Sequence, residues 1–332
     1  MPELRQNLAT KEWVIIATER AKRAADFVES NAHLTIETEP PYDPNCPFCP
    51  GNEELDLEIE RWPKQGAWQT RVIHNKYPAL AEEGVLERSF DGVHRWIAGV
   101  GHHEIMVDHP QHNTTWALMT AAEIQAVLET FYLRGWAIRE DPRIEQIIYF
   151  KNHGLRAGAT LRHPHCQIIG LPIVPHNIRQ RIEEARRYFD DTGLCVYQVM
   201  LNEELDRTER MVAISEHFVA CVLYAATSPF NLWIIPRFQS VSFLYSRPEE
   251  LEDLAKILRD VLRRLYVGLR DPSYNLIIRT APVKEIGNAY LNWYVTIVPR
   301  LSRAAGFELG SGMFINPALP EESAEYLRSV EI

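Results

Sequence analysis

The stretch His163-Pro164-His165-Cys166-Gln167 decides how this sequence is interpreted, because it opens an apolar run that predicts a strand over residues 164–171. Side chains two residues apart on a strand lie on the same face, about 6.6 Å apart, so His163, His165 and Gln167 share one face. A single histidine in a strand is more often a hydrogen-bonded core residue. However, unpaired buried polar groups cost about 1–3 kcal/mol each. Three polar side chains on one face of an apolar segment therefore indicate a functional surface.

The elements around this strand follow an order that recurs in the second half of the chain. The first half predicts strands at residues 12–17, 69–74, 94–99, 103–107 and 144–151, a helix at 121–139 and a turn at 152–160. The second half predicts strands at 217–224, 230–235, 274–279 and 292–298, and a helix at 248–265. Glu123 aligns with Leu251 (251 − 123 = 128) and His163 with Asn292 (292 − 163 = 129). These offsets indicate an internal duplication, although any two α+β halves look alike at this level of detail.

This order predicts an α+β fold of two tandem halves that share one sheet, each an antiparallel sheet with helices packed on it. The expected boundaries are residues 1–176 for the first half, 177–209 for a helical connector and 210–332 for the second half. Where the first half has its two histidines, the second reads Asn292-Trp293-Tyr294-Val295-Thr296. The second half is therefore expected to be catalytically degenerate.

Composition and charge exclude several classes of protein. The 332 residues carry a formal charge of −10 and no Lys/Arg tract, so neither nucleic acid nor an anionic membrane is an expected partner. No uninterrupted apolar run approaches the roughly 18 residues of a transmembrane helix. The cysteine count of five is odd, and residues 1–10 lack an apolar signal region. We therefore expect a protein of the reducing cytoplasm.

Two of the cysteines form the pair Cys46-Pro47-Phe48-Cys49 in a proline-punctuated loop. The spacing fits a redox pair or half of a zinc site, but a redox pair usually opens a helix after a strand. Structural zinc normally has four sulfur and nitrogen ligands, and the candidates for the other two are His163 and a histidine of Asp108-His109-Pro110-Gln111-His112. The remaining cysteines are expected to be small core residues. They are Cys166, Cys195 and Cys221.

Further motifs accompany these two features. They are Arg20-Ala21-Lys22-Arg23, Cys46-Pro47-Phe48-Cys49-Pro50-Gly51-Asn52, His74-Asn75-Lys76-Tyr77-Pro78, His103-Glu104-Ile105, Pro110-Gln111-His112, Lys151-Asn152, Gly158-Ala159-Thr160, and the tail Gly306-Phe307-Glu308 with Gly310-Ser311-Gly312. With them the chain resembles, over nearly its whole length, the galactose-1-phosphate uridylyltransferase family, the transferase branch of the histidine-triad superfamily. Each piece is weak alone, but His-Pro-His-x-Gln combined with the upstream cysteine pair is highly specific. The resemblance implies histidine-triad-like halves and a homodimer whose active site borrows the neighbour's tail.

The resemblance also implies a double displacement on a nucleoside diphosphate sugar. His165 would attack the α-phosphorus, expel hexose 1-phosphate and hold the nucleotide as a phosphoramidate until a sugar phosphate or phosphate takes it. A neutral imidazole suits this role near pH 7, and Gln167 would donate to a nonbridging phosphate oxygen. Substrate-binding roles are implied for further residues that match the family. These are Arg20, Arg23, Asn152, Gly158 and Thr160 at the phosphates, Asn75 at the nucleotide, and Phe307 and Gly310 in the hexose-contacting tail.

Matching to the family places one structural zinc ion on Cys46, Cys49, His112 and His163, where it would anchor the strand that presents the nucleophile. The sequence does not distinguish zinc from iron in the cell. Some members carry a second metal on histidines of the second half, and the absence of histidine from residues 292–296 predicts that this metal is missing. The Gly-Ser-Gly tail also departs from the best-studied uridylyltransferases, which have a lysine and acidic residues there. It is closer to relatives among which ADP-glucose phosphorylases occur.

We therefore expect a nucleotidyltransferase that exchanges UMP between UDP-glucose and galactose 1-phosphate. The alternative is an adenylyltransferase that phosphorolyses ADP-glucose, because base and sugar preference depend on pocket shape. A histidine-triad hydrolase of nucleotides is a third interpretation. Gln167 argues against it, since it stands where such hydrolases have a histidine that helps protonate the leaving group. A noncatalytic zinc scaffold would make His165 dispensable.

Overall fold

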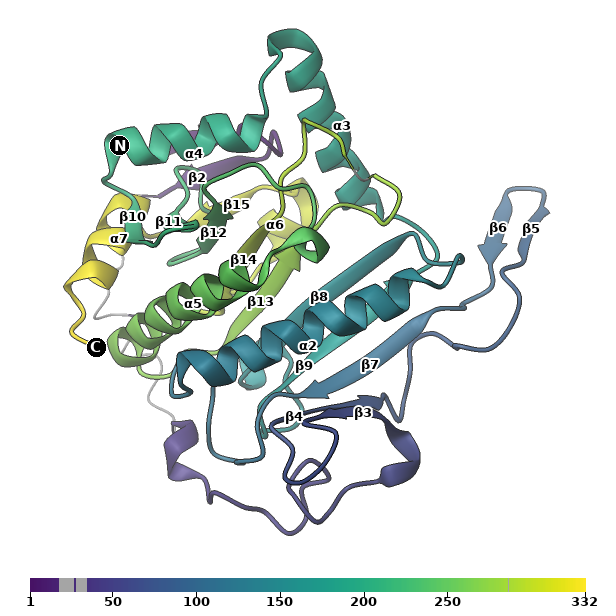
Figure 1. The fold of residues 1–332 in the computed structure, drawn as a ribbon. Helices are drawn as coiled ribbons and strands as arrows, with labels where there is room; N and C mark the ends of the chain where they lie inside the picture. Colours follow the sequence, from purple (N-terminus) through teal and green to yellow (C-terminus); the bar gives the residue numbers. More distant parts are fainter. Residues whose placement is uncertain (18–26, 28–34, 286) are drawn as a thin grey trace.

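The computed structural model describes residues 1–17, 27, 35–285 and 287–332, and a ten-stranded sheet forms its centre. The strands are β3 (Glu58–Trp62), β4 (Thr70–His74), β7 (His102–Val107), β8 (Gln146–His153), β9 (His165–Leu171), β10 (Met211–Ile214), β11 (Phe218–Val222), β12 (Leu232–Pro236), β13 (Tyr274–Arg279) and β14 (Tyr294–Pro299). Their order is β10-β11-β12-β14-β13-β8-β9-β7-β4-β3, and neighbours are antiparallel. Helices α2 (Ala121–Arg139) and α5 (Pro248–Leu269) lie side by side across one face (Figure 1).

The two halves of the chain use the same strand order. Outward from the centre, the first half runs β8-β9-β7-β4-β3 and the second runs β13-β14-β12-β11-β10. Each half contributes five strands to this sheet, and along the chain a helix follows the third of them. Helix α2 follows β7, and α5 follows β12. Strands β8 and β13 pair with each other, so both halves share one sheet, as the sequence predicts. The duplication itself and the domain boundaries stay predictions.

The long helices form where the sequence carries both an apolar stripe and an end signal. In α2 the Thr120 side chain accepts a hydrogen bond from the backbone N–H of Glu123, and the Glu123 carboxylate accepts one from the backbone N–H of Thr120. This capping box satisfies two donors that the first turn leaves unpaired. The helix matches its predicted bounds. Helix α5 continues four residues beyond the predicted end at 265, because Leu269 is still buried in the core.

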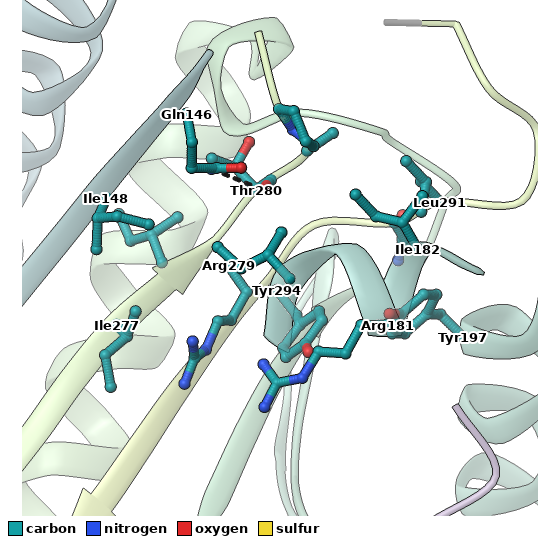
Figure 2. A pocket seen from close by; sticks show the side chains of 15 residues that line it. Gln146, Ile148, Arg181, Ile182, Tyr197, Ile277, Arg279, Thr280, Leu291 and Tyr294 are labelled. Carbon is teal, nitrogen blue, oxygen red and sulfur yellow. Dashed lines mark hydrogen bonds between the residues drawn. The ribbon is translucent and has the colours of Figure 1, made fainter. Parts of the chain in front are cut away.

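Alternation along the strands assigns each side chain to one face of the sheet. Cys166 and Ile168 of β9 pack into the main core beneath the helices, and so do Val295 and Ile297 of β14. Residues that are 129 positions apart in β9 and β14 therefore face the same side of the sheet. Tyr294 thus occupies the position in the second half that His165 occupies in the first. A cleft lies where β8 ends and β9 begins. A second pocket lies where β13 ends and β14 begins (Figure 2).

The helical connector predicted between the two halves consists of two separate helices. Helix α3 (His176–Thr192) ends at Gly193, whose φ of 72° is a left-handed conformation that glycine adopts without strain, and α4 (Val196–Arg207) follows. The predicted strand at 94–99 also lies outside the main sheet. It forms β6 (His94–Ile97), which pairs with β5 (Arg88–Asp91) in a separate two-stranded hairpin.

The two ends of the chain meet in a small three-stranded sheet. Strand β2 (Trp13–Ile16) pairs with β1 (Glu3–Gln6) and, in parallel, with β15 (Phe314–Asn316). Helices α6 (Gly306–Ser311) and α7 (Pro320–Ser329) flank β15 in sequence, and α7 packs against α5. Among the helices that the structure describes, none has the length and apolar character needed to cross a membrane.

Candidate active site and metal centre

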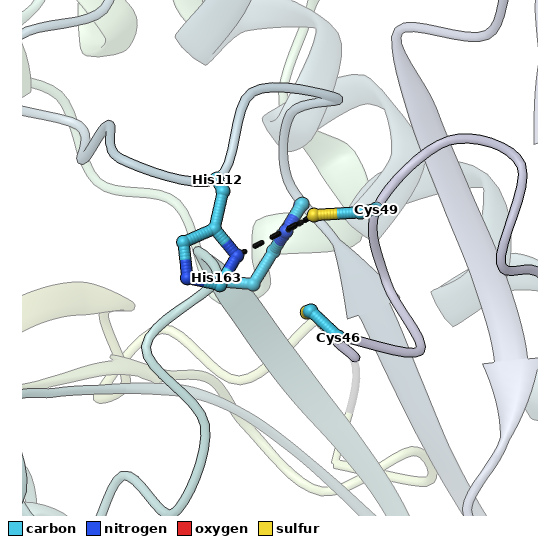
Figure 3. Close-up of side chains that lie close together, drawn as sticks. All are labelled: Cys46, Cys49, His112 and His163. Carbon is cyan, nitrogen blue, oxygen red and sulfur yellow. Dashed lines mark hydrogen bonds between the residues drawn. The ribbon is translucent and has the colours of Figure 1, made fainter. Parts of the chain in front are cut away.

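Four side chains from three separate loops come together beside the start of β9 (Figure 3). They are Cys46, Cys49, His112 and His163, and their candidate ligand atoms lie within 4.8 Å of one another. The Sγ atom of Cys49 is 3.4 Å from Nδ1 of His112 and 3.6 Å from Nδ1 of His163. In tetrahedral zinc, bonds of about 2.3 Å to sulfur and about 2.0–2.1 Å to nitrogen put these atoms about 3.5 Å apart. The group therefore has the spacing of a Cys2His2 zinc site.

The protonation of this group also fits a metal. Nε2 of His163 donates to the backbone carbonyl oxygen of His109 at 2.7 Å, so Nδ1 keeps its lone pair for a ligand. Burial lowers the pKa of His163 to about 3, and the imidazole is neutral. Burial also raises the pKa of the Cys46 thiol to about 11. A divalent cation offsets this cost and holds both thiols as thiolates. Two histidines beside the cysteine pair favour a metal site over a redox pair.

His165 begins β9 and lines a cleft with a cavity volume of about 460 Å³. Its Nδ1 donates to the backbone carbonyl oxygen of His163 at 2.8 Å. In a neutral imidazole the other nitrogen, Nε2, then carries the lone pair. Burial, reinforced by the positive charge of Lys151, lowers the pKa of His165. The imidazole is therefore neutral, with one nitrogen fixed and the other available as a nucleophile.

A buried ion pair holds the backbone on both sides of His165. Nζ of Lys151 lies 2.6 Å from Oδ2 of Asp108 and donates to the carbonyl oxygen of His165 at 3.2 Å. The backbone N–H of Asp108 donates to the carbonyl oxygen of Pro164 at 3.0 Å. Trp116 adds a hydrogen bond from Nε1 to the same carboxylate oxygen at 2.8 Å. Sequence reasoning missed this pair. The sequence contains one signal for it. Lys151 lies in a predicted strand at a position that faces the helices, and a buried lysine needs an anionic partner.

The side chain of Gln167 is oriented by a histidine that sequence reasoning also missed. Nδ1 of His103 accepts the backbone N–H of Ala79 at 3.0 Å, so its Nε2 carries the proton and donates to Oε1 of Gln167 at 2.9 Å. The amide nitrogen of Gln167 is then free to donate to a ligand. Nδ2 of Asn75 lies 3.1 Å from Nε2 of His103, which as a donor cannot accept a hydrogen bond from it.

The glycine-containing turn after β8 is fixed by residues of the second half. Asn275 donates from Nδ2 to Oδ1 of Asn152 at 2.8 Å and to the carbonyl oxygen of Ala157 at 2.9 Å. This contact leaves the amide nitrogen of Asn152 as its free donor group. At Gly154, whose φ is +78°, a Cβ atom would lie only 2.3 Å from the Ser273 hydroxyl. The close approach to β13 therefore requires glycine.

The other predicted substrate-binding residues have different positions. Gly158 and Thr160 belong to the turn that borders the cleft, and Gly158 has a φ of +89°. Phe307 and Gly310 lie on α6 and are not among the residues that line the cleft of this chain. Their contact with a substrate stays a prediction. Arg20 and Arg23 lie outside the residues that the structure describes.

The chain is similar to proteins of one family along its whole length. Residues 1–175 match the family model of the galactose-1-phosphate uridyl transferase N-terminal domain. The whole chain is 35% identical to an ADP-glucose phosphorylase of Arabidopsis thaliana, covering 93% of it, and 29% identical to a galactose-1-phosphate uridylyltransferase of Thermotoga maritima, covering 99%. It also superposes on the crystal structure of an ADP-glucose phosphorylase from Arabidopsis thaliana with bound ADP-glucose. That match has a TM-score of 0.84 and 32% identity, and covers 100% of this chain and 99% of the other.

Proposed function

Because the chain belongs to the galactose-1-phosphate uridylyltransferase family, we propose that it is a nucleotidyltransferase that works through a covalent intermediate on His165. The observation that carries this proposal is the 2.8 Å hydrogen bond from Nδ1 of His165 to the carbonyl oxygen of His163. It selects the tautomer whose Nε2 lone pair can attack phosphorus. A buried histidine with only a structural role has no need of a position in a large cleft.

In the first step, Nε2 of His165 attacks the α-phosphorus of the nucleoside diphosphate sugar. A phosphorus–nitrogen bond forms while the bond to the bridging oxygen breaks, and the sugar 1-phosphate leaves with the electron pair. Gln167 donates from its free amide nitrogen to a nonbridging oxygen, where negative charge is held in the transition state. Asn152, oriented by Asn275, donates to the phosphates in the same way.

In the second step, an oxygen of phosphate or of a sugar phosphate attacks the same phosphorus. The phosphorus–nitrogen bond breaks, and its electron pair returns to Nε2 of His165. Zinc on the four-residue group would brace the loops that hold His163 and hence the adjoining start of β9. The chemistry at phosphorus belongs to His165 and the amide donors.

For the substrates, we propose ADP-glucose as the donor and phosphate as the acceptor, which gives glucose 1-phosphate and ADP. This reverses the order of preference drawn from the sequence alone. It is supported by 35% identity to an ADP-glucose phosphorylase, against 29% to a galactose-1-phosphate uridylyltransferase. The second candidate, transfer of UMP from UDP-glucose to galactose 1-phosphate, is supported by that second relative and by the family model.

A product assay separates the two candidates. The protein is incubated with ADP-glucose and phosphate, or with UDP-glucose and galactose 1-phosphate, and the nucleotide products are separated by chromatography. ADP formation that exceeds UDP-galactose formation supports the first candidate, and the opposite ratio supports the second. Inactivity in both mixtures, in protein that retains its metal, counts against both.

We further propose that the protein is a homodimer in which the partner's α6 region completes the sugar end of the cleft. Phe307 on α6 is 44% exposed in the single chain, which leaves a large apolar side chain available for such a contact. Light scattering should give twice the 38.4 kDa mass of one chain. A monomer at concentrations where the enzyme is active would contradict this proposal.

A further inference from the structure

The second half of the chain contains a pocket at the place that corresponds to the cleft beside His165. It lies at the end of β13 and the start of β14, has a cavity volume of about 50 Å³ and is bordered on one side by α3 (Figure 2). Tyr294 stands there at the position of His165. Arg279 ends β13 on the face that Asn152 occupies near the end of β8. The strand order thus leaves a hollow at the same place in each half, but the hollow of the second half is much smaller and has different side chains in it.

Two arginines from different elements converge in this second pocket. Arg181 comes from α3 and Arg279 from β13, and their guanidinium groups extend side by side next to Tyr294 (Figure 2). The Nε atom of Arg279 is buried and has no hydrogen-bond partner among the described residues. Tyr294, which is hydrogen-bonded to Arg181, does most to favour the charged form of both arginines, and the acidic side chain that contributes is Glu12. It is exposed, and its carboxylate already accepts a hydrogen bond from the Thr10 hydroxyl at 2.9 Å.

This arrangement is costly unless an anion joins it. A charged group loses its hydration on burial, and without a close counter-ion no other interaction compensates for that loss. Burial and the neighbouring Arg181 lower the pKa of Arg279 despite the favourable effect of Tyr294. Two adjacent guanidinium groups match the oxygen atoms of a phosphate group, to which each can donate two hydrogen bonds. A phosphate between them would pair with Nε of Arg279 and offset the mutual repulsion of the two guanidinium groups.

We propose that this second pocket binds a phosphate group between Arg181 and Arg279 and does not react with it. Tyr294 brings a phenol hydroxyl where the first half brings an imidazole nitrogen, so the pocket lacks the nucleophile of the cleft. Apolar side chains line the rest of the pocket and can cover the body of an organic phosphate. These are Ile148, Ile178, Ile182, Ile277 and Leu291. The ligand is therefore free phosphate or the phosphate of a nucleotide or sugar phosphate, bound as an effector.

Equilibrium dialysis of radiolabelled inorganic phosphate against the full-length, metal-loaded protein tests this proposal. Arg279→Gln and Arg181→Gln should each weaken one phosphate-binding site about tenfold or more, as expected for lost charge-assisted hydrogen bonds. Arg187→Gln is the matched control. It removes an exposed arginine from the same helix, where the side chain pairs with Glu184 one turn away, and it should leave binding unchanged. Asn152→Ala, which alters the cleft instead, should leave this site intact.

The stability of the same variants distinguishes a binding role from a structural one. Without phosphate, Arg279→Gln should melt at the same temperature as the unsubstituted protein or higher, because it removes an unpaired buried charge. Competition by AMP or glucose 1-phosphate would identify an organic phosphate as the ligand, and no competition would identify free phosphate. Unchanged phosphate binding in the Arg181→Gln/Arg279→Gln double variant would overturn the proposal. So would a lower melting temperature of Arg279→Gln without any change in phosphate binding.

Discussion

Nε2 of His103 donates to Oε1 of Gln167 across 2.9 Å, and the backbone N–H of Ala79 fixes the opposite side of the same imidazole at 3.0 Å. A glutamine amide can turn over by rotation about its last bond, which exchanges its oxygen for its nitrogen. Here that rotation would set two donors against each other. His103 is therefore a positioning residue that keeps the amide nitrogen of Gln167 directed to a ligand.

Removing this histidine should slow nucleotidyl transfer without removing any contact to the substrate. We expect His103→Ala to lower kcat/KM for the nucleotide sugar about tenfold, and Gln167→Ala to lower it about a hundredfold because the donor itself is lost. In the double variant the two effects should not add, since His103 acts through Gln167. If His103→Ala slowed the Gln167→Ala enzyme by a further factor of about ten, the positioning role would be wrong.

The buried pair under the nucleophile should be far more important for stability than a pair at the surface. The side chains of Lys151 and Asp108 are 1% and 0% exposed, whereas those of Lys76 and Glu54 are 57% and 46% exposed. Lys151→Met leaves a buried carboxylate without its cation and should lower the free energy of unfolding by about 3–5 kcal/mol. Lys76→Met should leave it almost unchanged, because water screens an exposed ion pair. Denaturant titrations that gave equal effects would contradict this assignment.

Metal removal should destabilise the protein and disturb the start of β9. Protein purified without chelator should contain one zinc ion per chain by emission spectrometry, and a strong chelator should lower its melting temperature. Cys46→Ala should lose the metal. Cys221→Ala is the control, because this thiol is equally buried but lies in a separate apolar cluster, and it should keep the metal. Protein with no bound metal before chelation would exclude the zinc site.

The pH dependence of the first step should reflect the environment of His165. Burial lowers its pKa, with a further contribution from Lys151, so the neutral, nucleophilic form persists as the pH falls below about 6.5, where free imidazole takes up a proton. Single-turnover rates of adduct formation should therefore stay constant from neutral pH to below that value and decline only under more acidic conditions. A rate that is already half-maximal at about pH 6.5 would show an unshifted nucleophile.

Local sequence signals predicted those parts of the fold that depend on neighbouring residues. Helix α2 matches its predicted range of 121–139, and β13 also matches its predicted range of 274–279. The break in the connector at Gly193 was not predicted, because glycine is compatible with both a helix end and a helix interior. The pairing of β15 with β2 was not predicted either, since it joins residues near opposite ends of the chain.

The candidate site likewise combines features that local sequence patterns predict with contacts between distant residues that they do not. The cysteine pair indicated a metal site, the resemblance to the family implied its four ligands, and the structure brings those four side chains together. The contacts of His103 with Gln167 and of Lys151 with Asp108 depend on strand register, which no local pattern defines. The missing histidines predict a catalytically degenerate second half and say nothing of a binding site there. Only the fold places Arg181 of the connector beside Arg279 of the sheet.

The most direct test of the central claim is the intact mass of the protein after incubation with ADP-glucose in the absence of an acceptor. We predict an added mass equal to one AMP group that is lost on acid treatment, that is absent in His165→Asn, and that is retained in His176→Asn, which changes an exposed histidine at the start of α3. A UMP adduct formed only from UDP-glucose would preserve the role of His165 and reverse the choice of donor. No adduct from either nucleotide sugar, or an adduct that persists in His165→Asn, would contradict the account.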